Sequence, residues 1–302
     1  MTVSGALDPE DLSLFLKLHH SFLVYVAQRT GIAPSLRTQD DFLALPRGKK
    51  VKLWQASFRG GELLDGFIRS NPFGFSNEEI EEVRSWKNGI KGTFLIVKLT
   101  KEGAIFLEEK GKDARAYLVR PLVSPFEEVL PFPPPVRAEA VLLPFKGKIV
   151  YDGWLSSYRI FFGGGMSRSI RAACDDAIIE HGLIRSLPST PEEGGGYGDE
   201  EKLLYYLKTK ERREEHYEEI EKMLRRNRAL IPVYHREMGR VNSRRQSDLL
   251  RDVGVERGWF AIAGDVIVAS GRTRDDVERA VDAILPEDKR RAAYIFELKG
   301  RR

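Results

Sequence analysis

Val-Leu-Leu-Pro-Phe-Lys-Gly-Lys-Ile-Val-Tyr-Asp-Gly-Trp occupies residues 141–154, and Tyr-Arg-Ile-Phe-Phe-Gly-Gly-Gly-Met-Ser-Arg-Ser occupies residues 158–169. The first segment holds two apolar runs typical of β-strands, with a turn predicted at Asp152-Gly153. The second segment begins as a strand and passes through three consecutive glycines into an amphipathic helix that extends to about Glu180. This pattern predicts a fold but no particular enzymatic reaction.

The residues before this stretch are helical in pattern. A helix is predicted over residues 10–29, followed by shorter helices over 39–45, 51–57 and 62–70. Ser76 and Glu79 form a capping box that begins a further helix, which extends to about residue 86. The apolar residues expected in the core of this helical part are Phe67, Phe73, Phe75, Ile80, Val83 and Trp86. His19 and His20 are adjacent and therefore point about 100° apart on a helix, so they predict no metal site.

Between the helices and the opening stretch, the pattern changes to β-strands. Strands are predicted over residues 93–99, 104–108 and 114–119, which form an antiparallel meander because turn-forming clusters separate them. Two more strands are predicted over 136–143 and 148–151. The proline-rich segment between the third and fourth strands is interpreted as a crossover packed on the sheet.

Four short phrases occur in a fixed order along this region: Asn71-Pro72-Phe73-Gly74, Val83-Arg84-Ser85-Trp86-Lys87, Leu143-Pro144-Phe145-Lys146 and Ile149-Val150-Tyr151-Asp152-Gly153. Together they resemble a prokaryotic family of uncharacterised proteins over roughly residues 40–175. The resemblance implies no activity and no site residue. It implies only that the helical part and the β-rich part fold together.

The glycine loop is a candidate anion site. A strand, a glycine loop and a helix N-terminus follow one another, and exposed amides with the helix dipole attract anions there. The candidate anion-binding residues are Gly163, Gly164, Gly165, Ser167 and Arg168. Neither a complete Walker motif nor a dinucleotide-binding motif is present, and the alternative interpretation is a tight turn that lets the helix pack on the strand.

The remainder of the chain is organised around charge. Residues 188–198 are almost free of apolar side chains and are interpreted as a flexible linker between a domain of residues 1–187 and the rest. A long, highly charged helix is predicted from residue 199 to about 228, within a helical segment of residues 199–251. Residues 252–302 are predicted to form a small ββαβ domain with strands at 258–263, 266–270 and 292–298. Its hairpin, residues 259–271, is similar to another small prokaryotic domain of unknown function.

Between residues 222 and 251 the charge is one-sided. Nine basic residues stand against Glu237 and Asp248, a local net charge of +7 in a chain whose net charge is +4. Arginines at this density, with Tyr234 and His235 between them, are typical of surfaces that contact successive phosphates. The candidate nucleic-acid-binding residues are Lys222, Arg225, Arg226, Arg228, Arg236, Arg240, Arg244 and Arg245. The alternative interpretation is a solvated helix that pairs with the acidic residues of 211–221.

Catalysis is poorly supported by the sequence. The single cysteine, Cys174, lies among apolar helix residues where a buried, inert thiol is expected, and the five histidines form no metal-binding or triad pattern. We therefore predict no catalytic residue, no metal and no cofactor. The absence of a long apolar run excludes a membrane span. The lone cysteine and the acidic N-terminus indicate a cytoplasmic protein, and the scarcity of Gln and Asn indicates a thermophilic source.

The predicted fold class is α+β: an N-terminal helical unit on an antiparallel β-rich region, a long charged helix and a C-terminal ββαβ unit. The leading hypothesis is a non-enzymatic, cytoplasmic protein that contacts nucleic acid or a ribonucleoprotein through its basic helical segment. One alternative is a regulator or enzyme that binds a phosphate ligand at Gly163–Gly165. Another is a protein-assembly module that uses residues 199–228.

Overall fold

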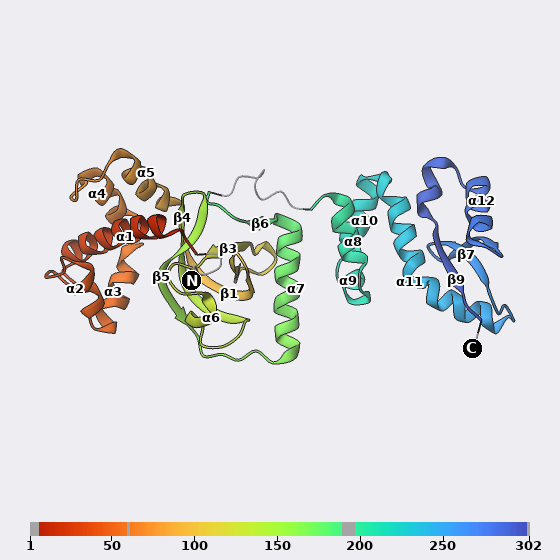
Figure 1. Cartoon of the computed structure of the whole chain (residues 1–302), viewed down its shortest axis with the longest axis horizontal. Coiled ribbons are helices and arrows are strands. Elements are labelled where there is room, and N and C mark those ends of the chain that lie inside the picture. Colours follow the sequence, from red (N-terminus) through yellow and green to blue (C-terminus); the bar gives the residue numbers. More distant parts are fainter. Residues whose placement is uncertain (1–5, 59–60, 189–196, 301–302) are drawn as a thin grey trace. The chain divides into compact units, whose positions relative to one another are not determined.

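The computed structural model describes residues 6–58, 61–188 and 197–300 of the chain. Most of the predicted linker, residues 189–196, lies outside this described part. The chain divides into two compact units, residues 1–196 and 197–302 (Figure 1), and each is described by itself. Both units contain helices and a β-sheet, which is mixed in the first unit and antiparallel in the second, so the predicted α+β class is confirmed.

The first unit begins with a group of helices, as predicted. They are α1 (Pro9–Thr30), α2 (Gln39–Ala44), α3 (Arg47–Ser57), α4 (Glu62–Ser70) and α5 (Asn77–Ser85), followed by the 3₁₀ turn η1 (Trp86–Asn88). The capping box of α5 is present, because the Ser76 hydroxyl accepts a hydrogen bond from the Glu79 N–H at 3.2 Å and the Ser76 N–H donates to the Glu79 carboxylate at 2.9 Å. Of the predicted core residues, only Phe73 is misplaced. It is 43% exposed because it lies in the turn between α4 and α5.

A barrel follows the helices. Its strands are β1 (Ile90–Thr100), β2 (Gly103–Glu108), β3 (Ala116–Arg120), β4 (Val136–Phe145) and β5 (Lys148–Ser157). The predicted antiparallel meander β1-β2-β3 is confirmed. Strand β4 pairs antiparallel with both β1 and β5, and β5 pairs parallel with the end of β3. The sheet therefore closes in the order β1-β2-β3-β5-β4, and the short strand β6 (Leu183–Ile184) pairs parallel with the first part of β3, whereas β5 pairs with its end.

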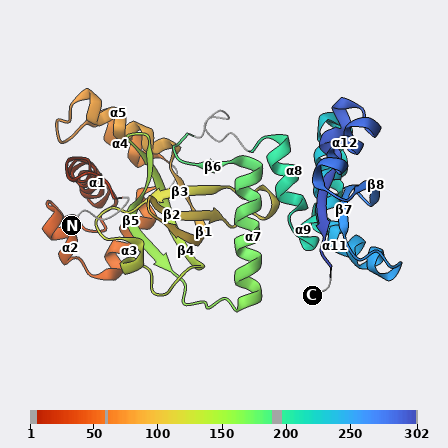
Figure 2. The same cartoon turned by 45° about the vertical axis from the view of Figure 1, so that its right-hand side comes forward.

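This strand order, with the short helix α6 (Phe126–Val129) between β3 and β4, is the connectivity of an OB-fold barrel. Side chains alternate along the strands, so Phe106 of β2 faces the barrel core while Ile105 and Leu107 face outward. Helix α7 (Gly164–His181) covers the outward face, where its Ile170 and Cys174 pack on β1, β2 and β3 (Figures 1 and 2). The helices α1, α3, α4 and α5 share one hydrophobic core with the barrel interior.

The opening stretch of the sequence folds differently from its prediction at one point. The chain reverses at Lys146-Gly147, where both residues have positive φ (46° and 70°), as a two-residue type I′ hairpin turn requires. The predicted turn at Asp152-Gly153 is wrong, because strand β5 runs through both residues. They form a β-bulge, in which the register shifts between Ala140 and Leu142 on β4 and Gly153 has a φ of +83°. The residues just before the glycine loop, 158–162, are not a strand.

The second unit contains four helices where the sequence predicted one long helix and a basic segment. These are α8 (Asp199–Leu207), α9 (Lys210–Glu215), α10 (Tyr217–Arg226) and α11 (Ile231–Asp252), with the 3₁₀ turn η3 (Arg228–Leu230) before α11. The continuous helix predicted over 199–228 is therefore wrong. It breaks because the Thr209 backbone is extended and its hydroxyl accepts a hydrogen bond from Arg212 N–H at 3.3 Å, which begins a new helix.

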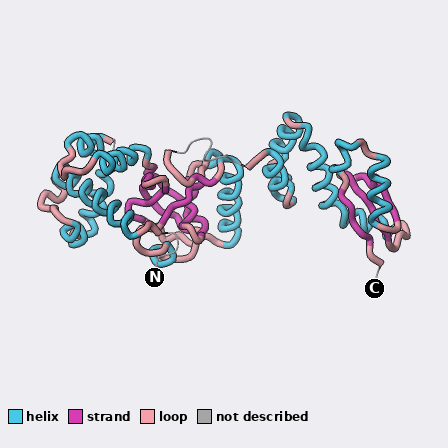
Figure 3. Tube along the Cα trace, turned by 45° about the horizontal axis from the view of Figure 1, so that its top comes forward, coloured by secondary structure: helices cyan, strands magenta, loops and turns pink. Residues whose placement is uncertain are grey.

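The C-terminal ββαβ arrangement is confirmed. Strands β7 (Gly258–Ala263), β8 (Val266–Gly271) and β9 (Tyr294–Leu298) form a sheet in the order β8-β7-β9, with α12 (Arg274–Ile284) and the 3₁₀ helix η4 (Glu287–Ala292) between β8 and β9. Helix α11 packs on one face of the sheet and α12 on the other (Figure 3). The approach of α11 is close at Gly239, where a Cβ atom would lie 2.7 Å from the carbonyl oxygen of Ile262.

Candidate functional site

The basic segment lies at the surface of the second unit. All eight candidate nucleic-acid-binding residues are exposed. Half of them pair with nearby carboxylates. The pairs are Lys222 with Glu219 at 3.6 Å, Arg225 with Glu221 at 3.1 Å, Arg226 with Asp199 at 2.9 Å and Arg240 with Glu237 at 2.7 Å. The alternative interpretation, pairing with the acidic residues of 211–221, therefore holds for Lys222 and Arg225.

The other half have no such partner. In the described part of the chain, no hydrogen bond or ion pair is made by the side chains of Arg228, Arg236, Arg244 and Arg245. A guanidinium is always charged and presents five donors in a planar fork that matches the oxygen atoms of a phosphate. These four side chains are therefore exposed donors that the fold leaves available.

Helix geometry divides the arginines of α11 between two sides. Arg236, Arg240 and Arg244 follow one another at intervals of four residues, so they lie within an arc of about 80° and extend about 12 Å along the helix axis. We call these three residues the arginine stripe. Arg245 points about 100° away from Arg244 and lies outside the stripe.

The side of α11 that carries neither the arginine stripe nor Arg245 is hydrogen-bonded to the sheet. The amide nitrogen of Asn242 donates to Gly264 O at 3.3 Å, and that of Gln246 donates to Asp265 O at 3.0 Å. Both acceptors lie in the turn between β7 and β8. These bonds fix the rotation of α11 about its axis and so fix the direction in which the arginine stripe points.

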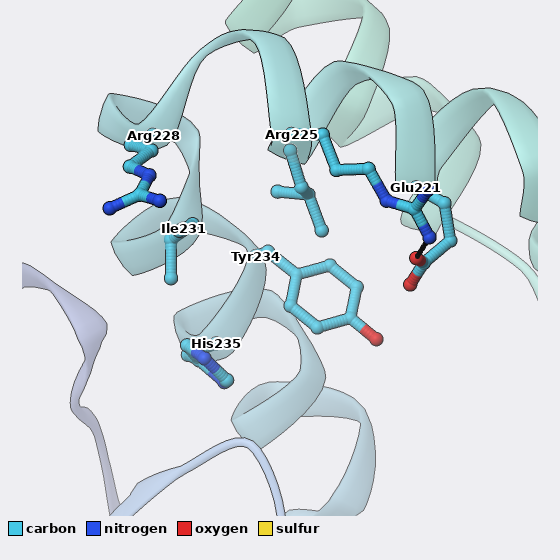
Figure 4. A pocket seen from close by; sticks show the side chains of 7 residues that line it. Glu221, Arg225, Arg228, Ile231, Tyr234 and His235 are labelled. Carbon is cyan, nitrogen blue, oxygen red and sulfur yellow. Dashed lines mark hydrogen bonds and ion pairs between the residues drawn. The ribbon is translucent and has the colours of Figure 1, made fainter.

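A pocket of about 540 Å³ lies where α10 turns into α11. The residues that line it are Glu221, Leu224, Arg225, Arg228, Ile231, Tyr234 and His235. Figure 4 shows the Tyr234 ring in the middle of this Tyr234 pocket, with Arg225 and Glu221 on one side and Ile231 and Arg228 on the other. Burial raises the pKa of Tyr234, so its hydroxyl keeps its proton and remains a hydrogen-bond donor. An aromatic face beside the unpaired guanidinium of Arg228 offers stacking and phosphate contact together.

Two further basic residues of this surface were missed by the sequence analysis. Lys289 and Arg291 lie in η4, which packs against α11. Both are exposed, and neither side chain has a hydrogen-bond or ion-pair partner within the described ranges. They are distant from the basic segment in sequence, so only the fold brings them beside it. The run Lys289-Arg290-Arg291 was nevertheless visible as a short basic cluster.

The glycine loop has no comparable arrangement. Gly163 caps α7, and the Ser167 hydroxyl donates to the carbonyl of Phe162 at 3.1 Å rather than projecting from the loop. Arg168 donates to Gly164 O at 3.4 Å. A Cβ atom at Gly163, Gly164 or Gly165 would meet nothing within 4 Å, so close packing does not require glycine at these positions. Anion binding by this loop stays a prediction.

The outer face of the barrel is also occupied. In OB-folds the face of strands 2 and 3 binds oligonucleotides and oligosaccharides. Here α7 buries that face, and its Cys174 is 3% exposed with a pKa that burial raises to about 12. The thiol is therefore buried, as predicted, and its raised pKa favours the protonated form. Helix α7 therefore covers the face that OB-folds use for such ligands.

Comparisons with protein-family models, with curated proteins and with solved structures find no match. The function must therefore be argued from the residues themselves. Within the described ranges, the helices are all too short or too polar to cross a membrane.

Proposed function

We propose that this chain is a binding protein for single-stranded nucleic acid, RNA foremost, and that the second unit makes the contact. The observation that carries the proposal is the arginine stripe, in which Arg236 and Arg244 are exposed and unpaired on one side of a helix whose rotation the sheet fixes. Positive groups held at a regular spacing release counterions when they meet a phosphate backbone, and this release favours binding.

The Tyr234 pocket favours single strands over duplexes. A base stacks on an aromatic ring only when its face is free, and in a duplex both faces of the base are covered by its neighbours. Tyr234 is half-buried between Leu224 and Ile231, so its ring is held in place before a base arrives. The unpaired Arg228 lies at the same pocket and is positioned to contact the flanking phosphate.

The test is a binding titration with a fluorescein-labelled single-stranded RNA of roughly 12 nucleotides, within the range of site sizes of such surfaces. Anisotropy is measured at several salt concentrations, for the wild type and for Arg236→Glu/Arg244→Glu. The logarithm of the affinity should fall linearly with the logarithm of the salt concentration. Loss of two phosphate contacts should reduce that slope by about 1.4, since each contact on a single strand contributes about 0.7.

A matched control is present on the other face of the sheet. Arg274 and Arg279 of α12 are exposed arginines that pair with Glu278 and Asp276. The variant Arg274→Glu/Arg279→Glu changes the net charge by the same amount and leaves α11 untouched. If this control weakens binding as much as the stripe variant does, the binding reflects net charge alone and the proposal fails.

The pocket has its own test. Tyr234→Ala should weaken RNA binding by about 5-fold to 150-fold, because stacking of one base contributes roughly 1–3 kcal/mol. Tyr197→Ala, at an exposed tyrosine outside the pocket, should leave the affinity unchanged. Equal affinities for the two variants would remove the pocket from the interface and leave only the arginines.

The proposal includes a cytoplasmic ribonucleoprotein as the partner, since an RNA at its surface presents the same phosphates. Sedimentation of the protein with ribosomal particles at low salt, and its release at high salt, would identify that form of the partner. If the variant Arg236→Glu/Arg244→Glu fails to sediment with the particles at low salt, the contact is assigned to α11.

A further inference from the structure

The first unit contains a pocket that the sequence analysis did not find. It has a volume of about 500 Å³, within the range of small-molecule sites. Helices α1, α2 and α3 supply one side, and the bulge of β5 with the segment after β3 supplies the other. Its lining includes His19, Lys50, Trp54, Tyr151, Asp152 and Trp154. We call it the Asp152 pocket.

A carboxylate is buried in its wall. Asp152 is only 5% exposed, and among the described residues it forms no ion pair. Its one hydrogen bond is from the Trp154 N–H at 3.1 Å. The Trp54 indole N–H lies near the carboxylate without satisfying hydrogen-bond geometry. The β-bulge at Asp152-Gly153 directs this side chain inward, and bulges of this kind are common beside functional sites.

Two further polar atoms of the lining have no partner. His19 Nε2 and Trp54 Nε1 are buried and make no hydrogen bond within the described ranges. Their residues are 5% and 7% exposed. Buried polar atoms are normally paired. Trp54 Nε1 is a donor whose nearby acceptor is the Asp152 carboxylate, whereas a nitrogen of the neutral His19 ring can accept a hydrogen bond from a bound molecule.

Aromatic rings form much of the wall. The rings of Trp54 and Trp154 lie 6.4 Å apart between centroids, and Phe42 and Tyr151 complete the set. Two lysines already use such rings as cation sites. The Lys91 ammonium lies 4.5 Å from the Trp54 ring centroid, and the Lys50 ammonium lies 5.5 Å from the Phe42 centroid.

The charged groups around Asp152 leave its carboxylate poorly neutralised. The two histidines of α1 are uncharged at neutral pH. Burial lowers the pKa of His20, and burial together with the nearby His20 ring lowers the pKa of His19 to about 3. Lys91 of β1 attracts the Asp152 charge, but it is itself exposed. Burial raises the pKa of Asp152 to about 7 and that of Tyr151 to about 12. Lys50 of α3 lies at the pocket wall.

We propose that the Asp152 pocket binds a small organic cation, an ammonium or amidinium group on an apolar body, with Asp152 as its counter-ion and the aromatic rings around it. A cation supplies the ion pair that Asp152 lacks, and its apolar body fits the remaining aromatic and aliphatic lining. An anion would be repelled by the carboxylate. A metal ion is disfavoured, since three metal-ligating atoms do not converge at this pocket in the described part of the chain.

The experiment uses the full chain and isothermal titration calorimetry at pH 8. The probes are three cations, benzylammonium, benzamidinium and benzyltrimethylammonium, with benzyl alcohol as the uncharged analogue and benzoate as the anion. At least one cation should bind at least tenfold more tightly than benzyl alcohol and benzoate. Failure of all three cations to bind, or equal binding of the alcohol or of benzoate, would overturn the proposal.

Variants locate the binding. Asp152→Asn keeps an acceptor for the Trp154 N–H and removes the charge, and should weaken the bound cation at least tenfold. Asp113→Asn, at an exposed carboxylate of the same unit, should bind it as the wild type does. Tight binding by Asp152→Asn would refute the role of Asp152.

A measurement on the wild type alone guards against a misfolded variant. The affinity for benzamidinium should fall about tenfold from pH 8 to pH 6, because the cation must displace a proton from Asp152. Burial lowers the pKa of His20, which favours its neutral form, and Tyr151 keeps its proton over this range because burial raises its pKa to about 12. Titrations at pH 7 in two buffers of different ionisation enthalpy should reveal proton release on binding. Equal heats in the two buffers, with a pH-independent affinity, would contradict the proposal.

Discussion

At the scale of single residues, the fold places titratable groups where their ordinary charge is unfavourable. Asp152 and His19 line one cavity, and burial moves their pKa values in opposite directions, to about 7 and about 3. In each case burial favours the neutral form. At neutral pH the His19 ring is therefore a neutral partner for the ring of Phe15, which stacks on it with centroids 5.5 Å apart. Asp152, in contrast, is divided between its two forms.

The raised pKa of Asp152 predicts a pH dependence of stability. Below its ordinary pKa of 3.8, the carboxyl is protonated in both the folded and the unfolded chain. Between pH 3.8 and about 7 the carboxyl ionises only in the unfolded chain, so the free energy of unfolding falls as the pH rises. Above pH 7 this loss of stability is constant. A shift of about three units corresponds to roughly 4 kcal/mol.

The variant Asp152→Asn cannot ionise, so it should gain stability relative to the wild type between pH 4 and pH 8. Urea unfolding of both proteins at pH 4, 6 and 8 measures the difference, with Glu127→Gln at an exposed carboxylate as the control. A difference that stays constant with pH would show that Asp152 is ionised normally in the folded chain.

At the scale of elements, the seating of α11 on its sheet decides where the arginine stripe points. The contact depends on Gly239, since any larger residue would bring a Cβ atom within 2.7 Å of Ile262 O and 3.1 Å of Ile262 Cγ2. The clash is with backbone, which cannot rotate away. Close approach of helix and strand at this point holds Asn242 and Gln246 within reach of the β7–β8 turn.

Gly239→Ala should therefore loosen α11. Alanine favours a helix by up to about 1 kcal/mol over glycine, but overpacking against backbone costs about 1–3 kcal/mol, so the clash wins. Hydrogen exchange followed by mass spectrometry should show faster exchange of the amides of residues 231–252. Gly165→Ala in α7, where the added methyl meets nothing within 4 Å, should not speed exchange anywhere. Unchanged protection of α11 in Gly239→Ala would mean that the helix is not seated through this glycine.

At the scale of the whole molecule, each of the two units has its own core. The barrel and the N-terminal helices share one hydrophobic cluster, whereas the second unit has clusters on both faces of its sheet. The division at residue 196 also separates the two proposed activities, since the Asp152 pocket belongs to the first unit and the arginine stripe to the second.

We expect residues 1–188 and 197–302, produced separately, to fold and to divide these activities between them. Each fragment should unfold cooperatively in urea, because each keeps its own hydrophobic clusters. The second fragment should retain the RNA affinity of the full chain within about threefold, and the first should not bind RNA at low salt. RNA binding by the first fragment would move the interface away from α11.

The sequence predicted the local elements well and the long-range arrangement poorly, for physical reasons. Ser76 with Glu79 marks a helix start because the capping box is local, and the apolar alternation of β1 to β3 marks strands for the same reason. Closure of the barrel depends on the pairing of β3 with β5, which no local pattern specifies. Asp152 and Gly153 are residues typical of turns. A β-bulge also places its glycine at positive φ, so composition alone could not distinguish a turn from a bulge at this point.

The candidate sites divide in the same way. The exposure of Arg236 and Arg244 could be inferred from the density of charge, and their alignment from their spacing, but the direction in which they point depends on how α11 is seated on the sheet. The Asp152 pocket was out of reach, because its walls come from α1, α3 and β5, which are far apart in the chain.

The closed barrel also has a consequence for synthesis. Strand β1 ends at Thr100, but its second neighbour β4 begins only at Val136, and the parallel partner of β3 comes later still, at Lys148. Translation proceeds at roughly 5–20 residues per second, so a nascent chain holds an unpaired β-edge for several seconds before it closes. A message broken between these points releases a fragment with that edge open, which makes it a substrate for chaperones and proteases rather than a smaller working protein.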